Sequence, residues 1–191
     1  MELIDTIKKD LKETLSERRY IHSIGVMEMC AKLAQIYGVD VQKAQIAGLL
    51  HDIAKEMPKE EMFKYVEENN IEITEIEKIS YQILHGKIGA DIAKKKYGLD
   101  EQIQNAIKYH TTTSPEMDTL AKIVYVSDKI EMNRKLEGYD LEYERELAQK
   151  DLDKTVLYII DASIKSLVEK GKLIEKEVDT RNYLILKNLK V

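Results

Sequence analysis

Apolar residues recur at helical spacing along nearly the whole chain, and no stretch sustains the alternation of apolar and polar residues that a half-buried strand requires. The chain has only two prolines and eight glycines, so few residues interrupt the periodic runs. This pattern predicts an all-α bundle. The expected helices span residues 3–16, 18–37, 40–57, 58–69, 74–96, 100–111, 116–137, 142–170 and 178–188.

The ends of these runs carry residues that typically stop or start helices. Four glycines each follow a periodic run, as C-terminal stop residues do: Gly38, Gly98, Gly138 and Gly171. Three N-cap residues and one proline in a first helical turn are expected at helix starts: Asp40, Thr74, Asp100 and Pro58. No repeat or low-complexity linker separates the runs, so we expect one domain over residues 1–191.

Polar side chains interrupt the apolar faces of several predicted helices. Three of the four histidines share a face with apolar residues and are expected to point inward: His22, His85 and His110. Asp128 continues the stripe of Ala121 and Val124 in a helix that is apolar almost all round. Because a buried carboxylate without a partner is costly, Asp128 is expected to need a cation.

Six side chains form an ordered series that uses every histidine of the chain: His22, His51, Asp52, His85, His110 and Asp128. His51 and Asp52 fall with Lys55 on the polar arc of the 40–57 helix. Singly, a buried histidine is more often a core residue bonded to a carbonyl, and a His-Asp pair often occurs by chance. Jointly, the six favour a site for divalent iron, manganese, zinc or magnesium, in which a shared carboxylate could join two ions.

Composition narrows the class of protein. The 191 residues are 43% hydrophobic, enough for a sizeable core, and 30 basic against 35 acidic residues give a net charge of −5. No overall basic field attracts nucleic acid, and no run of 18 apolar residues predicts a membrane span. The single cysteine, Cys30, is expected in the core and fits a reducing compartment. We therefore expect a soluble, cytoplasmic protein with neither nucleic acid nor membrane as partner.

The motifs resemble those of the HD-domain metal-dependent phosphohydrolases and, within them, the YqeK family of symmetrical bis(5′-nucleosyl)-tetraphosphatases. Five segments carry the resemblance: RYIHSIGV (19–26), AGLLHDIAK (47–55), HGKIGA (85–90), AIKYHTT (106–112) and SDKIEMNR (127–134). They lie in a motif-bearing core at about 18–138, followed by a C-terminal helical layer at about 139–191. Where the family commonly has glycine and proline, this chain has Thr113 and Met132.

The resemblance implies the roles of individual residues. One ion would be held by His22, His51, Asp52 and Asp128, and a second by His85, His110 and the bridging carboxylate of Asp52. Iron is the first choice, and manganese, magnesium or zinc suit the same ligands. A hydroxide bridging the ions would attack phosphorus. The expected catalytic residues are Asp52, Lys55 and Arg134, and the expected substrate-binding residues are Arg19, Lys55, Lys129 and Arg134.

The resemblance further implies hydrolysis of diadenosine tetraphosphate to two ADP. A phosphatase acting on mononucleotides and a non-catalytic nucleotide sensor stay open as alternatives. Two other classes of HD enzyme are disfavoured. Guanosine tetraphosphate hydrolases have Glu-Asp where this chain has Lys55-Glu56, and cyclic-dinucleotide phosphodiesterases have a Gly-Tyr-Pro element that this chain lacks. The sequence leaves open the native metal, the nucleobase preference, a homodimer and the role of residues 139–191, whose apolar stripe could be core or a dimer surface.

Overall fold

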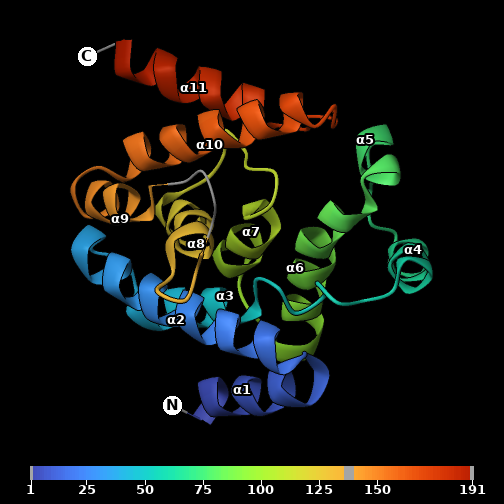
Figure 1. Cartoon of the computed structure of the whole chain (residues 1–191). Helices are drawn as coiled ribbons and strands as arrows, with labels where there is room; N and C mark the ends of the chain where they lie inside the picture. The colour runs from blue at the N-terminus through green and yellow to red at the C-terminus, as the bar shows by residue number, and fades with distance from the viewer. Residues whose placement is uncertain (1, 136–139, 190–191) are drawn as a thin grey trace.

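The computed structural model describes residues 2–135 and 140–189, and every regular element in that part of the chain is a helix (Figure 1). The predicted all-α class is confirmed. The elements are α1 (Glu2–Thr14), α2 (Glu17–Tyr37), α3 (Val41–Leu50), α4 (Lys59–Glu68), α5 (Glu75–Ile79), the 3-10 helix η1 (Tyr81–Ile83), α6 (Leu84–Tyr97), α7 (Glu101–Tyr109), α8 (Thr119–Ile130), α9 (Leu141–Lys150), α10 (Leu152–Glu169) and α11 (Glu177–Leu189).

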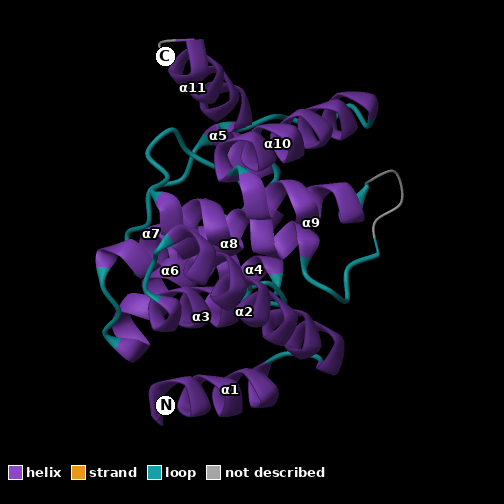
Figure 2. Cartoon of the chain, turned by 90° about the vertical axis from the view of Figure 1, so that its left-hand side faces the viewer, coloured by secondary structure: helices purple, strands orange, loops and turns teal. Residues whose placement is uncertain are grey.

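The centre of the bundle consists of α2, α3, α6, α7 and α8. α2 packs against α3 and α8, while α7 packs against α3, α6 and α8. α1 lies at one end of the molecule, and α10 and α11 lie at the other (Figures 1 and 2). The packing of α10 and α11 is continuous with this centre, since Ile160 and Leu184 share one apolar cluster with Leu33 and Leu49. No helix among the described residues is long and apolar enough to cross a bilayer.

The predicted helix ends are largely confirmed. The side chains of Asp40, Thr74 and Asp100 each accept the amide hydrogen three residues on, as N-caps do. Left-handed glycines follow three helices, with φ of 66° at Gly38, 64° at Gly98 and 60° at Gly171. Pro58 directly precedes α4 and so stands one position before the first turn. Gly138 lies outside the described residues.

The predicted 40–57 helix is wrong at its C-terminal end, because α3 stops at Leu50. Residues 51–57 continue as turns in which amides bond to carbonyls three residues earlier. Pro58 is too far from Leu50 to cause this break, since proline disfavours helical backbone at the residue directly before it.

This change of direction determines where the His-Asp pair lies. His51 and Asp52 are 0% and 2% exposed, so the expectation that they lie on the polar arc of a helix is wrong. Lys55 is half-buried in the same turn, and its amide donates to the carbonyl of Asp52 over 2.9 Å. The turn therefore directs the side chains of His51 and Asp52 toward the interior.

Three further predicted helices are shorter or broken. The 74–96 segment breaks at Ser80, whose ψ of 52° is not helical, and resumes through η1 as α6. The 142–170 segment breaks at Asp151, which has extended backbone and caps α10 by accepting the amide of Lys154. α8 covers only Thr119–Ile130 of the expected 116–137. The breaks at Ser80 and Asp151 do not occur at a glycine or proline. The apolar periodicity continues through both positions, so the sequence does not indicate that the helices end there.

Thr113 occupies a position where the family pattern has glycine. Its φ of 58° lies in the left-handed region, which strains a β-branched residue. The side chain is fully buried, and its hydroxyl donates to Oγ1 of Thr180 in α11 over 2.9 Å. The Thr180 hydroxyl in turn donates to the carbonyl of Lys176 over 3.2 Å. These bonds join the C-terminal layer to the loop that follows His110.

Replacing Thr180 with valine should therefore destabilise the protein. Valine keeps the branched shape but leaves the buried Thr113 hydroxyl without its acceptor, and we expect a loss of about 1–3 kcal/mol in the free energy of unfolding. Urea unfolding followed by circular dichroism measures it. Thr180→Ser retains the hydroxyl and is the matched control, so equal losses in the two variants would contradict the assignment.

Candidate metal centre

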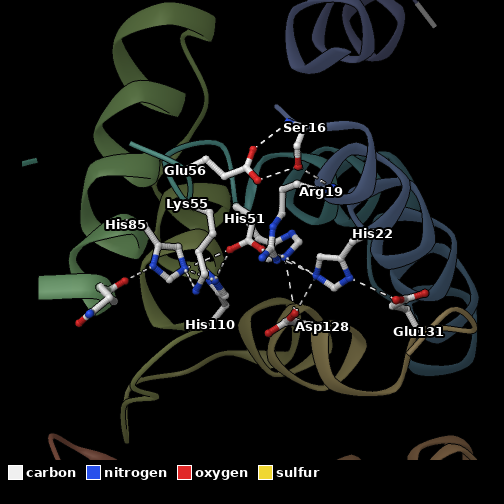
Figure 3. Close-up of polar contacts among 12 residues, drawn as sticks. Ser16, Arg19, His22, His51, Lys55, Glu56, His85, His110, Asp128 and Glu131 are labelled. Atoms are coloured by element: carbon white, nitrogen blue, oxygen red, sulfur yellow. Dashed lines mark hydrogen bonds and ion pairs between the residues drawn. The ribbon is translucent and has the colours of Figure 1, made fainter. Parts of the chain in front are cut away.

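Side chains from five parts of the bundle converge at one buried place. All six predicted ligands are at most 8% exposed. They come from α2 (His22), the turn after α3 (His51 and Asp52), the first turn of α6 (His85), the C-terminal end of α7 (His110) and α8 (Asp128). Figure 3 shows the histidines in a row, with His22 at one end and His85 at the other.

The Asp52 carboxylate lies between two pairs of histidines. Its Oδ2 is 3.3 Å from Nε2 of His51 and 3.8 Å from Nε2 of His22. Its Oδ1 is 3.1 Å from Nε2 of His85 and 3.5 Å from Nε2 of His110. Each oxygen of this one carboxylate therefore faces a different pair.

Asp128 completes the first half of the cluster. Its Oδ1 lies 3.0 Å from Nε2 of His22 and 3.6 Å from Nε2 of His51. Ligand atoms of these three residues lie within 4.8 Å of one another, as do those of His51, Asp52 and His110. Two groups that share His51 can thus each offer three donors to one ion.

Backbone carbonyls fix the orientation of three imidazoles. Nδ1 of His51 faces the Gly48 carbonyl at 2.7 Å, and Nδ1 of His110 faces that of Ile107 at 2.6 Å. His85 makes the same contact with Gln82. With Nδ1–H donating to the carbonyl, Nε2 of a neutral ring carries a lone pair and faces the cluster.

Those Nε2 atoms crowd together in a way that suits a cation. The Nε2 atoms of His85 and His110 are 3.0 Å apart, and those of His22 and His51 are 3.3 Å apart. Two lone pairs at such distances repel each other unless a proton or a metal ion lies between them. The donor set therefore fits divalent metal ions, which imidazole and carboxylate bind well.

Both carboxylates are held in the ionised form. Burial would raise the pKa of Asp52, yet the charge of His51 and the polar contacts with His110 and His51 hold it well below its usual range. Burial acts on Asp128 in the same way, and the nearby Lys129 charge, with hydrogen bonds from histidines, lowers its pKa well below the usual range. The centre thus carries fixed negative charge at neutral pH.

The histidines respond to this charge differently. Burial is the main cause that lowers the pKa of His110 to about 4. Burial opposes protonation of His51 as well, but the Asp52 charge and contacts with Asp128 outweigh it and raise its pKa to about 9. A metal ion bound by His51 must therefore displace a proton, so metal binding releases protons at neutral pH.

Four cationic side chains surround the centre, and all four were predicted to bind substrate. Arg19 Nη1 lies 2.6 Å from Asp52 Oδ2. Arg134 Nη2 and Lys129 Nζ lie 2.6 Å and 2.7 Å from the two carboxylate oxygens of Asp128. Lys55 Nζ is 3.3 Å from Nε2 of His85, and burial lowers its pKa. The structure brings these cations to the ligands, while contact with substrate stays a prediction.

Glu131 is a site residue that the sequence analysis missed. It is 2% exposed, and its Oε1 lies 3.2 Å from Nδ1 of His22, where the other histidines have a carbonyl. Gly25 makes room for it, because a Cβ there would overlap the Glu131 carboxylate. Glu131 directly follows α8, so helical periodicity could not indicate its direction. The sequence feature that could have indicated Glu131 is its position in the same motif segment as Asp128.

Glu56 is a second residue without a predicted role. Its carboxylate accepts the amide and the hydroxyl of Ser16, each over 2.7 Å, and Ser16 is the N-cap of α2. These bonds tie the start of α2 to the His-Asp turn (Figure 3). They thereby hold Arg19, three residues after Ser16, beside Asp52.

Comparison with known proteins identifies the family of the chain. The HD domain family model matches residues 19–133. The symmetrical bis(5′-nucleosyl)-tetraphosphatase of Bacillus subtilis is 37% identical over 85% of this chain and 86% of its own length. That of Staphylococcus aureus is 35% identical over 94% of this chain and 93% of its own length.

A solved structure is also similar. A crystal structure described as a predicted HD superfamily hydrolase involved in NAD metabolism, from Clostridium acetobutylicum, superposes with a TM-score of 0.91. It is 39% identical, and the match covers 96% of this chain and 97% of that one. The chain therefore belongs to the HD-domain family and, within it, to the family of the symmetrical bis(5′-nucleosyl)-tetraphosphatases.

Proposed function

We propose that the protein hydrolyses dinucleoside tetraphosphates symmetrically and converts diadenosine tetraphosphate into two ADP. The observation that carries this proposal is the Asp52 carboxylate, whose two oxygens face separate histidine pairs. A carboxylate in this position can bind two neighbouring ions, one through each oxygen. The relatives named for this activity match most of the chain, which supports the choice of substrate.

The six ligands would divide between two ions. His22, His51, Asp52 and Asp128 would hold one, and His85, His110 and Asp52 would hold the other, with iron as the first choice and manganese, magnesium or zinc as alternatives. Ions in these places would supply a water-derived nucleophile at neutral pH and polarise the phosphoryl oxygen. We place this reaction in the cytoplasm, with a small nucleotide as the partner.

The cationic side chains would act on the polyphosphate. Lys55 lies beside His85, and Arg134 lies beside Asp128, so they flank different halves of the cluster. Together with Arg19 and Lys129 they would neutralise phosphate charge during attack. A water oxygen would bond to one inner phosphorus, and the oxygen between the two inner phosphorus atoms would leave with the other ADP.

Product analysis tests the reaction. We expect metal-loaded protein to convert diadenosine tetraphosphate in oxygen-18 water into ADP alone, with one labelled oxygen for every two ADP. Mass spectrometry measures both quantities. Formation of ATP and AMP would exclude symmetrical cleavage, and faster turnover of mononucleotides would favour a general nucleotide phosphatase.

Asp52→Ala should be the most damaging change of a single ligand, because it removes the carboxylate between both histidine pairs. We expect turnover to fall by about a thousandfold or more, with Asp128→Ala next in severity. Circular dichroism checks that the helices persist. Asp179→Ala removes an exposed carboxylate from α11 and is the control. Near-normal turnover in Asp52→Ala would show that the shared-carboxylate assignment is wrong.

Glu131→Gln should weaken metal binding without removing a ligand. The neutral amide holds the His22 ring less strongly and makes it less basic, and such changes typically cost about 10–100-fold in metal affinity. Titration of metal-free protein with Mn²⁺, followed by calorimetry, measures this. Glu28→Gln changes an exposed glutamate of the same helix as His22 and should bind Mn²⁺ like the wild type. Equal affinities in all three proteins would leave Glu131 without this role.

A further inference from the structure

A cavity of about 320 Å³ opens at the His22 end of the metal centre. It lies between the first turns of α2 and the segment that follows α8. Its walls include Arg18, Ile21, His22, Asn133, Arg134 and Lys135. Because His22 belongs both to the metal centre and to this wall, the cavity adjoins the metal centre. We refer to it as the His22-side cavity.

The His22-side cavity is strongly cationic. Arg18, Arg19, Arg134 and Lys135 line it, against the single carboxylate of Glu131. That carboxylate is already engaged by the His22 ring and by a backbone amide. The lining therefore suits an anion that carries several charges, such as a diphosphate.

Two of these cations have no ionic partner among residues 2–135 and 140–189. Arg19 and Arg134 pair with the carboxylates of the metal centre. Arg18 and Lys135 are exposed, and neither forms a hydrogen bond or ion pair with any residue in the described ranges 2–135 and 140–189. Their charge is therefore available to a ligand.

The same cavity has an apolar element. Ile21 lines it one helical turn after Arg18 and is 48% exposed. A half-exposed aliphatic side chain next to cations matches a nucleotide, in which an apolar base and charged phosphates lie within one molecule. A simple inorganic anion would make no use of Ile21.

A larger cavity is less suitable. It has a volume of about 880 Å³ beside α6 and α7, and none of the six ligands lines it. Its four lysines are nearly balanced by three carboxylates: Lys87, Lys94, Lys108 and Lys176 against Glu72, Asp91 and Glu101. The excess of positive charge in this larger cavity is thus smaller than in the His22-side cavity. No residue of its lining is a predicted metal ligand.

We propose that the His22-side cavity binds one ADP half of the substrate, with Arg18 and Lys135 on its phosphates and Ile21 against its nucleoside. This inference rests on the proposed function, because symmetrical cleavage produces two identical halves and each needs its own place. The half on the other side of Asp52 would lie toward His85 and Lys55. Arg18 and Lys135 then contribute to the affinity for the nucleotide half that occupies the cavity.

The test uses the double variant Arg18→Gln/Lys135→Gln in the metal-loaded protein. We expect its KM for diadenosine tetraphosphate to rise about tenfold, with a smaller change in kcat, because charge-assisted hydrogen bonds to phosphate are lost. Calorimetric titration with ADP should give two bound molecules per wild-type chain and one per variant chain. Lys12→Gln/Lys32→Gln removes the same charge from exposed sites outside the cavity and is the control.

The outcomes separate this inference from the proposed function. A wild-type chain that binds a single ADP, or a double variant that matches the control in KM and ADP stoichiometry, would overturn the assignment of the cavity. Wild-type protein that forms ATP and AMP, or no product, from diadenosine tetraphosphate would overturn the proposed function, whatever number of ADP molecules binds. Reduced affinity confined to the Arg18 and Lys135 double variant is the result we expect.

Discussion

The position of the Asp52 carboxylate is the constraint on which the rest of the site depends. One oxygen faces His22 and His51, and the other faces His85 and His110. A single side chain therefore lies close to histidines from four segments of the chain. Placing an ionised carboxylate at 2% exposure is costly, and the surrounding imidazoles and the guanidinium of Arg19 offset that cost. The buried negative charge destabilises the folded protein, and the same charge favours the binding of divalent cations.

The bundle holds this carboxylate by interrupting its own helices. α3 ends directly before His51, and α6 begins directly before His85, so both histidines lie where the chain changes direction. Backbone carbonyls then fix three of the rings, while Glu131 fixes the fourth. Rigid helices supply the positions and irregular turns supply the directions, as precise sites on stable scaffolds generally require.

The sequence predicted which polar side chains meet in the interior better than it predicted the path of the chain. His22, His110 and Asp128 could be placed because each interrupts an apolar face whose period is visible. The turn at His51 and Asp52 could not, because their neighbours continue the helical pattern up to Pro58. The breaks at Ser80 and Asp151 lack glycine and proline, and the positive φ of Thr113 accompanies a buried bond to Thr180 in a distant helix. Such features are set by tertiary contacts, which local periodicity does not report.

The proposed chemistry requires two ions on opposite sides of Asp52. Anomalous diffraction at the manganese absorption edge, from crystals of active Mn²⁺-loaded protein, tests this most directly. We predict two peaks, one beside His22, His51 and Asp128 and one beside His85 and His110, with the Asp52 carboxylate between them. A single peak in protein whose crystallised sample retains full turnover would contradict the two-ion site.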